Sequence, residues 1–182
     1  MRLARLLRHA LATHWRTRLL FPSATQDAIQ EAIRQAERAH DGQIRFAIET
    51  ALTPLHVWHG VGARARAIEV FATLRVWDTE RNNGVLVYVL LADRSVEIIA
   101  DRGFRDRVDA AEWEAVCRVM ESHFRERHFK SGAVAGVEAV GKLISRHYPT
   151  GSAGGATAEG GAGRAGSAGT PGSELPDRPA LL

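Results

Sequence analysis

The chain has 182 residues, of which 45% are hydrophobic and 25% are charged, proportions typical of a globular domain. A single cysteine excludes an intramolecular disulfide and a cluster of thiolate metal ligands. Five arginines and no acidic residue lie within residues 1–20, while residues 21–149 are close to neutral, so no nucleic-acid partner is expected.

Residues 1–20 are predicted to form a basic amphipathic helix. Its apolar residues recur at helical spacing, and they are Leu3, Leu6, Leu7, Ala10, Leu11 and Trp15. Two interpretations stay open: this stripe packs on the domain, or it docks on a partner or a membrane surface. Arg8, His9 and Thr13 interrupt the apolar run, so we expect no secretory signal and a cytoplasmic protein with possible contact to a membrane surface.

The middle of the chain predicts alternating helices and strands. A loop is expected at residues 54–62 because it contains a proline and two glycines. The predicted elements are a helix from residue 23 to residue 41, strands at 43–50, 85–92 and 96–100, and helices around 67–74, 109–124 and 131–147.

The strand patterns predict how the sheet is built. Residues 43–50 alternate between apolar and polar, whereas residues 85–92 are apolar on both faces, as in a central strand covered by helices on both sides. A right-handed crossover makes these two strands parallel, and the short turn at residues 92–95 makes the next strand antiparallel. We therefore predict an α/β fold in the order α-β-α-β-β-α-α. Its small mixed sheet has two parallel strands plus an antiparallel hairpin partner and is sandwiched between helices.

The end of the chain differs in composition. Residues 150–182 hold nine of the 17 glycines and no aromatic residue. Such a stretch lacks the apolar side chains that a core needs, so it is predicted to be a disordered Gly/Ala-rich tail. The expected organisation is a helix at 1–20, a domain at 21–149 and a tail at 150–182.

Several segments resemble the TPM domain, a family also described as a domain of unknown function. They are Asn82-Asn83-Gly84-Val85-Leu86 within residues 78–86, Leu91-Ala92-Asp93-Arg94, Val96-Glu97-Ile98, and residues 124–140 with Phe129, Gly132, Gly136 and Val140. The resemblance covers about residues 23–148 and implies an α/β sandwich. Where the family has a glycine-x-glycine turn, this chain reads Asp101-Arg102-Gly103-Phe104.

The resemblance also implies activities and partners. Calcium binding and acid phosphatase activity have been attributed to plant members. Bacterial members tend to occur with LemA-like membrane proteins and with membrane-anchored TPM proteins, which are therefore the expected partners. With no signal peptide or anchor expected, the chain is similar to the short soluble bacterial members.

One end of the predicted sheet is rich in oxygen ligands. The candidate metal ligands there are Asp78, Glu80, Asn82, Asn83 and Asp101. Calcium or magnesium would suit such carboxylate and amide oxygens, while the alternative is an ordinary solvated turn. For a metal-dependent phosphatase, Asp101 and Arg102 are the catalytic candidates, because phosphoryl transfer needs positive charge around the phosphate.

The opposite end offers a second candidate site. Glu49, Asp93 and Arg94 follow the carboxyl ends of the first two strands, where open α/β sheets tend to bind ligands. The sequence alone does not indicate which end of the sheet holds the binding site. Cys117 falls on the apolar side of its helix and is expected in the core.

The function predicted from these patterns is a non-enzymatic TPM-type interaction module. It binds a protein partner at or near a membrane, with or without a divalent metal ion. One alternative is a divalent-metal-dependent acid phosphatase. Another is peripheral binding to an anionic membrane through residues 1–20.

Overall fold

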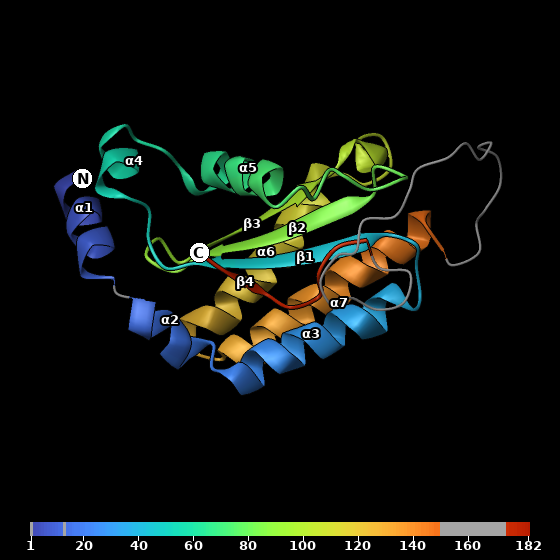
Figure 1. Cartoon of the computed structure of the whole chain (residues 1–182), viewed down its shortest axis with the longest axis horizontal. Helices are drawn as coiled ribbons and strands as arrows, with labels where there is room; N and C mark the ends of the chain where they lie inside the picture. Colours follow the sequence, from blue (N-terminus) through green and yellow to red (C-terminus); the bar gives the residue numbers. More distant parts are fainter. Residues whose placement is uncertain (1, 13, 150–173) are drawn as a thin grey trace.

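The computed structural model describes residues 2–12, 14–149 and 174–182, whose arrangement is shown in Figure 1. The elements are α1 (Arg2–Leu11), α2 (His14–Leu20), α3 (Ser23–Glu37), β1 (Gln43–Glu49), α4 (Pro54–Trp58), α5 (Ala63–Thr73), β2 (Gly84–Leu90), β3 (Ser95–Ala100), the 3-10 turn η1 (Arg102–Phe104), α6 (Ala110–Arg125), α7 (Phe129–His147) and β4 (Ala180–Leu181). Among these helices, none is long and apolar enough to cross a membrane.

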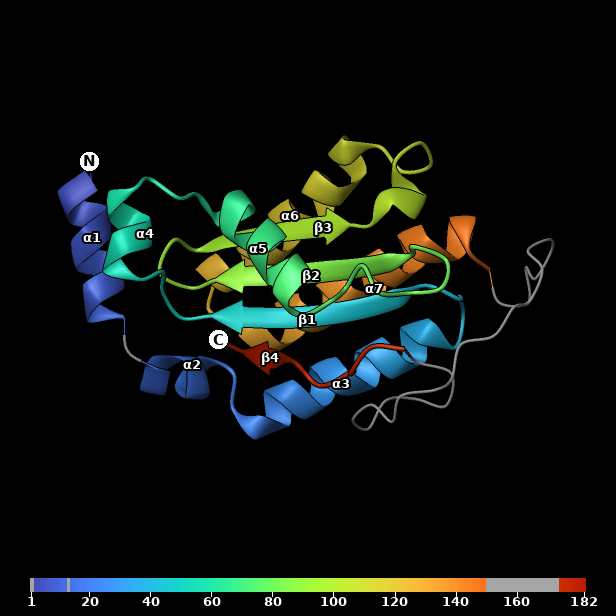
Figure 2. The same cartoon turned by 45° about the horizontal axis from the view of Figure 1, so that its top comes forward.

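The sheet is mixed and has the strand order β3-β2-β1-β4. Strands β1 and β2 are parallel, with Ile44 opposite Val85, and β2 and β3 form an antiparallel hairpin. The predicted pair of parallel strands with an antiparallel partner is therefore confirmed. A further strand, β4, pairs with β1 in parallel at the other edge of the sheet, as Figure 2 shows.

Helices cover both faces of the sheet, which makes the predicted sandwich. Helices α3, α6 and α7 lie against one face, and α5 lies against the other (Figures 1 and 2). Side chains of β2 alternate between the two layers: Val85, Val87 and Val89 join the larger core, and Leu86, Tyr88 and Leu90 join the smaller one. This two-sided burial explains why residues 85–92 are apolar at successive positions.

Two predictions for the N-terminal half are wrong. Residues 2–11 and 14–20 form separate helices, α1 and α2. Helix α1 is attached to the turn after β2, whereas Thr17 of α2 bonds the hydroxyl of Thr50 at 2.5 Å. A single straight helix would not reach both the turn after β2 and Thr50. The predicted loop at residues 54–62 contains α4, whose first turn is capped by Thr53 accepting from the His56 backbone N–H at 3.3 Å.

The predicted disordered tail at residues 150–182 is wrong for its last nine residues. Leu175 and Asp177 are buried, and Ala180 and Leu181 form β4. Averaged over the tail, the composition is poor in apolar residues, but two leucines of these nine residues, Leu175 and Leu182, pack in the smaller core. The prediction for residues 150–173 falls outside the described residues.

The close approach at the start of β2 gives a stability prediction. A Cβ added to Gly84 would collide with the Val76 carbonyl oxygen, so Gly84→Ala should lower the free energy of unfolding by about 1–3 kcal/mol. At Gly62 a Cβ meets none of the described atoms within 4 Å, so Gly62→Ala should cost less than about 1 kcal/mol. Urea denaturation followed by circular dichroism measures both. Equal losses would contradict the assigned contact.

Candidate functional site

Helix α1 is attached to the domain by its polar side. Arg5 and His9, one turn apart, both reach Asp93 in the turn between β2 and β3, at 2.6 Å from Arg5 Nη2 to Oδ2 and 3.0 Å from His9 Nε2 to Oδ1. Arg5 Nη2 also donates to the Val61 carbonyl at 2.8 Å. His9 is buried, and its Nδ1 accepts the Leu52 backbone N–H at 2.9 Å, which leaves Nε2 to donate to Asp93.

The electrostatics of this attachment favour a charged Asp93. Burial would raise the pKa of Asp93, but the hydrogen bonds from Arg5 and His9 and the charge of Arg5 outweigh it and hold that pKa below its usual range. A depressed carboxyl pKa stabilises the folded state above the unfolded value, about 3.9, and this stabilisation is lost as pH falls through the folded pKa. Helix α1 is therefore held at neutral pH and loosens only in acid.

Because its polar side faces inward, α1 presents leucines to solvent. Leu7 is 54% exposed and Leu11 is 76% exposed, so the interpretation that the apolar stripe packs on the domain is wrong for most of its length; Leu6 alone packs against the smaller core. Helix α4 packs beside α1 and extends the surface. We call this surface the apolar face; it consists of Leu3, Leu7, Leu11, Trp15, Leu19, Leu55 and Trp58.

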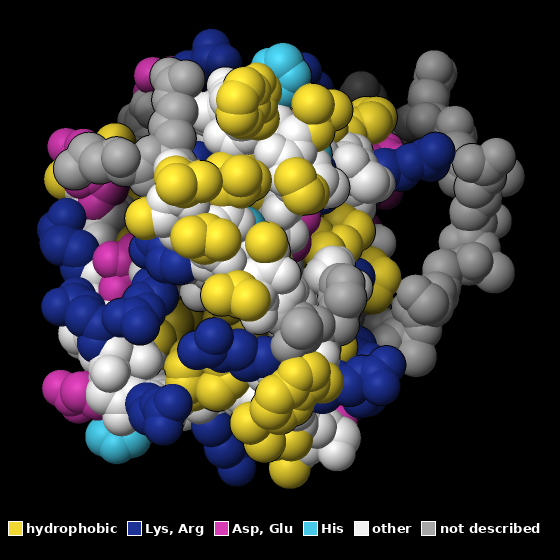
Figure 3. All heavy atoms as spheres, turned by 90° about the vertical axis from the view of Figure 1, so that its left-hand side faces the viewer, with side chains coloured by type: hydrophobic (Ala, Val, Ile, Leu, Met, Phe, Trp, Pro, Cys, Tyr) yellow, Lys and Arg dark blue, Asp and Glu magenta, His cyan; other side chains and the backbone are white. Residues whose placement is uncertain are grey.

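The apolar face is accompanied by positive charge. Figure 3 looks onto α1, α2 and α4 and shows hydrophobic side chains gathered there, with Lys and Arg side chains beside them. Arg8, Arg16, Arg18 and Arg94 are exposed, and residues 1–20 contain no acid. Arg8 Nη2 lies 3.7 Å from Asp93 Oδ1. A cavity of about 340 Å³ adjoins the face; Arg8, Leu11, Arg16 and Arg94 contribute to its walls. Arg94, predicted for the second candidate site, thus lies at the edge of this surface.

Glu49, the remaining residue predicted at that sheet end, belongs to a separate network. It is buried and accepts from Arg66 Nε at 2.9 Å and from the Tyr88 hydroxyl at 2.6 Å. Burial raises the pKa of Tyr88, and the bond to Glu49 raises it further. The same carboxylate raises the pKa of Arg66. Glu49 is therefore satisfied within the fold, and the structure does not join it with Asp93 and Arg94 in one site.

At the opposite sheet end the structure brings three predicted residues together. Asp101 Oδ1 caps η1 by accepting the Arg102 backbone N–H at 2.7 Å, and Arg102 Nε donates to Asn82 Oδ1 at 2.8 Å. Asn82 takes a positive φ of 51°, as its place in a turn anticipates. Asn83 is buried, and its Nδ2 donates to the Asp41 carbonyl at 2.8 Å.

Two buried oxygens at this end, Asn83 Oδ1 and Asp101 Oδ2, have no hydrogen-bond partner among the described residues. Asp78 and Glu80 are exposed, and the sequence missed a third carboxylate, Glu174, which accepts the Glu80 backbone N–H at 2.9 Å. Burial raises the pKa of Glu174, and the charges of Glu80 and Asp78 add to the rise.

The donor set at this end suits a cation only in part. Within residues 2–12, 14–149 and 174–182, no three His, Cys, Asp or Glu side chains are grouped so as to hold a metal ion. Calcium also accepts amide and carbonyl oxygens, and the two unpartnered oxygens, Asn83 Oδ1 and Asp101 Oδ2, are of the kinds it prefers. These two oxygens are therefore the candidate ligands at this end, and the exposed Asp78 and Glu80 add negative charge.

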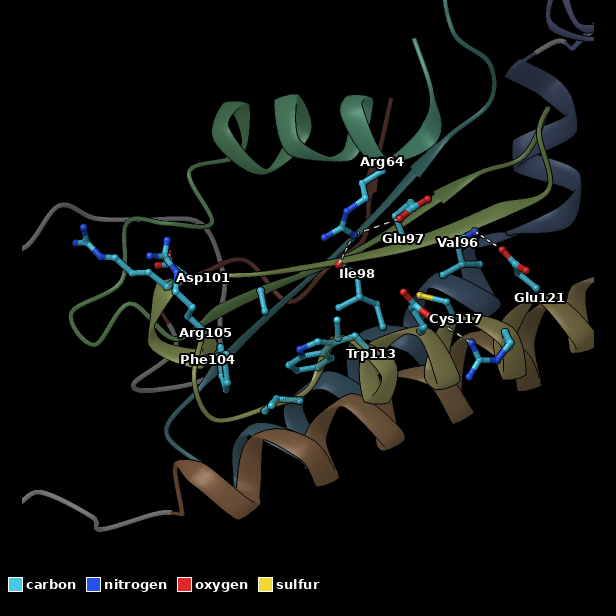
Figure 4. Close-up of a pocket in the computed structure, with 16 residues that line it drawn as sticks. Arg64, Val96, Glu97, Ile98, Asp101, Phe104, Arg105, Trp113, Cys117 and Glu121 are labelled. Carbon is cyan, nitrogen blue, oxygen red and sulfur yellow. Dashed lines mark hydrogen bonds and ion pairs between the residues drawn. The ribbon is translucent and has the colours of Figure 1, made fainter. Parts of the chain in front are cut away.

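Next to this end, a cavity of about 910 Å³ opens between β3, η1 and α6 (Figure 4). Asp101 and Arg102 line it, together with Arg64, which pairs with Glu97 at 3.4 Å. Cys117 also lines the cavity, so it is less enclosed than expected. Burial raises the pKa of the Cys117 thiol to about 12, and the thiol stays protonated near neutral pH. A thiolate nucleophile is therefore not available in this cavity.

Comparisons with known proteins decide the family. The family model of the TPM domain, which carries the label TPM phosphatase, matches residues 17–143. The chain belongs to the TPM domain family. The NMR structure of the BA42 protein from the psychrophilic bacterium Bizionia argentinensis is similar to this TPM domain, with 26% identity, a TM-score of 0.68, and coverage of 88% of this chain and 94% of BA42.

A second solved structure shares the fold alone. The NMR structure of the N-terminal domain of cg2496 from Corynebacterium glutamicum has 15% identity and a TM-score of 0.50 over 79% of this chain and 83% of that domain. No curated protein matches the sequence. In this TPM domain, α1 and segment 174–182 lie outside the residues that the family model matches.

The attachment of α1 to the TPM domain gives a second prediction. Asp93→Asn removes the charge that Arg5 and His9 share, so α1 should loosen and its amide protons, residues 2–11, should exchange about tenfold faster with solvent. Asp106→Asn, an exposed carboxylate in the turn after η1, is the control. Hydrogen exchange read by NMR measures both variants. Unchanged exchange in Asp93→Asn would contradict the assigned attachment.

Proposed function

We propose that this TPM domain is a non-enzymatic docking module that attaches to an anionic membrane surface through the apolar face. The observation that carries the proposal is the orientation of α1. Its polar residues Arg5 and His9 are used to bind Asp93, and its leucines consequently face solvent. Contiguous apolar side chains on a protein surface mark interaction sites.

The chemistry of the face suits a lipid surface. Leucine and tryptophan on one side of a helix and arginine beside them are typical of helices that lie in the membrane interface. Burying each leucine in acyl chains contributes about 1.5–3 kcal/mol, and each arginine near anionic headgroups adds about 1 kcal/mol. Arg16 and Arg18 are exposed, and Arg8 is exposed while also lying 3.7 Å from Asp93 Oδ1.

The protein partner predicted from the resemblance, a LemA-like or membrane-anchored TPM protein, stays a prediction and is the rival occupant of the same face. The two differ in what they require. A membrane requires anionic lipid and no particular sequence, whereas a protein partner requires matching contacts. The exposed arginines beside the apolar face, Arg16, Arg18 and Arg94, favour the membrane.

Vesicle binding tests this proposal. The protein should sediment with phosphatidylserine-containing vesicles and not with pure phosphatidylcholine vesicles, and the binding should weaken as salt rises. Leu7→Ser and Trp58→Ser should each weaken the binding about tenfold. Trp77→Ser is the matched control, because Trp77 is 50% exposed but precedes β2 at the opposite end of the sheet.

Two results would overturn the proposal. One is the absence of binding to either vesicle, which would leave the protein partner on the apolar face. The other is equal loss of binding in Trp58→Ser and Trp77→Ser, which would mean that tryptophan exposure anywhere on the surface explains the affinity.

A second candidate function, favoured by the buried oxygens of Asn83 and Asp101, is binding of calcium or magnesium at that sheet end. Bound cation would neutralise the neighbouring Asp78 and Glu80. The metal-dependent phosphatase, with Asp101 and Arg102 as catalytic candidates, stays a prediction that depends on this cation. The phosphatase label of the family model is its other support.

A calcium or magnesium titration followed by backbone amide NMR tests the second candidate. Shifts should be confined to residues 78–84 and 101–104, and Asp101→Asn should weaken the binding about tenfold while Asp106→Asn leaves it unchanged. If the cation binds, hydrolysis of p-nitrophenyl phosphate should be assayed with and without chelator. No shifts at millimolar ion, or shifts only around Glu49 and Asp93, would contradict this site.

A further inference from the structure

Segment 174–182 lies along the outer edge of β1. The surface that it covers includes Arg34, Gln43, Arg45, Ala47 and Ile48, and we call this surface the β1-edge groove. Two residue pairs, Ala47 with Ala180 and Ile48 with Leu181, join the segment to the sheet as β4, and the Leu182 N–H donates to the Ile48 carbonyl at 2.9 Å. The segment lies beside β1 at the sheet edge in Figure 2. Adding an extended peptide to a sheet edge is a common mode of peptide recognition.

Side chains of β1 hold the backbone of the segment before β4 begins. Gln43 Oε1 accepts the backbone N–H of Glu174 at 2.8 Å and of Leu175 at 3.3 Å. Arg45 Nη1 donates to the Pro176 carbonyl and, at 2.7 Å, to the Arg178 carbonyl. Side chains of β1 thus bind backbone groups of residues 174–178, ahead of the two-residue strand β4.

Two side chains of the segment enter the protein and give the groove its selectivity. Asp177 is fully buried, and its Oδ2 accepts from Arg34 Nε at 3.1 Å. Burial lowers the pKa of Arg45, and the charge of Asp177 opposes that effect, so the acid compensates two arginines at once. Leu175 is 5% exposed and packs in the smaller core. The groove therefore fits a peptide with a leucine two residues before an aspartate.

Residues 150–173 connect the domain to segment 174–182, and they are more numerous than this attachment requires. Pro149 pairs with His40, and Glu174 binds Gln43. The residues that flank 150–173 are therefore both attached to the four-residue stretch 40–43. A chain of 24 residues can span up to about 80 Å. The segment can therefore reach the groove of a neighbouring molecule as well as its own.

We infer that the β1-edge groove is a peptide-binding site whose ligand in trans is segment 174–182 of a second copy of this chain. In a dilute solution each groove holds its own segment, because the connection keeps that segment at an effective concentration of about millimolar. Exchange between copies becomes favourable when the copies are concentrated to that range. The inference does not depend on the proposed membrane function.

A complementation experiment with full-length chains tests this inference. Asp177→Ala keeps the groove and impairs the segment, whereas Arg45→Ala keeps the segment and impairs the groove. Each variant alone should be monomeric in light scattering after gel filtration. Their mixture should form a 1:1 complex of twice the monomer mass, because only the mixture contains an intact groove and an intact segment that are forced to pair in trans.

The test also needs a control mixture and a substitute for Arg45→Ala. Asp177→Ala mixed with the double variant Asp177→Ala/Arg45→Ala contains no intact segment and should stay monomeric. Arg34→Ala replaces Arg45→Ala if the latter does not fold by circular dichroism. A mixture of folded variants that remains monomeric at millimolar concentration overturns the inference.

A synthetic peptide of residues 174–182 provides the direct affinity measurement. Labelled with a fluorophore, it should bind the Asp177→Ala chain at least about tenfold more tightly than the unaltered chain, whose own segment competes. A peptide carrying Asp177→Ala should bind at least about tenfold more weakly, while Arg178→Ala should change little, because Arg178 is exposed. Equal binding of the peptide to both chains overturns the inference.

Discussion

The constraint on which this TPM domain depends is the burial of β2 on both faces. Helices α3, α6 and α7 cover one face fully, but α5 alone does not complete the other. The smaller core is finished by residues from both ends of the described chain, with Leu6 from α1 and Leu175 from segment 174–182. The two termini are thus structural parts of the sandwich, and each brings polar groups that determine where it attaches.

Both attachments rest on a carboxylate that gathers arginines. Asp93 holds α1 through Arg5, Arg8 and His9, and Asp177 holds its segment through Arg34 beside Arg45. Removing a partner from the buried Asp177 or the partly buried Asp93 is costly, because it leaves a charge that is less well compensated. The apolar contacts supply most of the burial, while the ion pairs determine the orientation. In α1 that orientation is what turns the leucines toward solvent.

The sandwich was predictable because local patterns decide it. Period-two alternation at residues 43–50 and two-sided apolar residues at 85–92 define the strands, and the hairpin follows from a short turn. The orientation of α1 was not predictable. Its leucine stripe has the pattern of a side that faces the core, and Asp93, which binds the opposite side, lies 84 residues after His9 in the sequence. Segment 174–182 was hidden by the glycine-rich composition averaged around it. At the acidic end, Asn82, Asp101 and Arg102 meet as neighbouring turns predict, whereas Glu174 arrives from a distant segment.

The sequence separation between β1 and the segment that covers its edge has a consequence for synthesis. Gln43 and Glu174 lie 131 positions apart, so β1 leaves the ribosome long before residues 174–182 are made. During that interval the nascent chain carries an unpaired strand edge, the kind of surface that promotes aggregation. Protection of that edge by chaperones is thus needed most while the last part of the domain is being translated, and a prematurely terminated product keeps the edge open permanently.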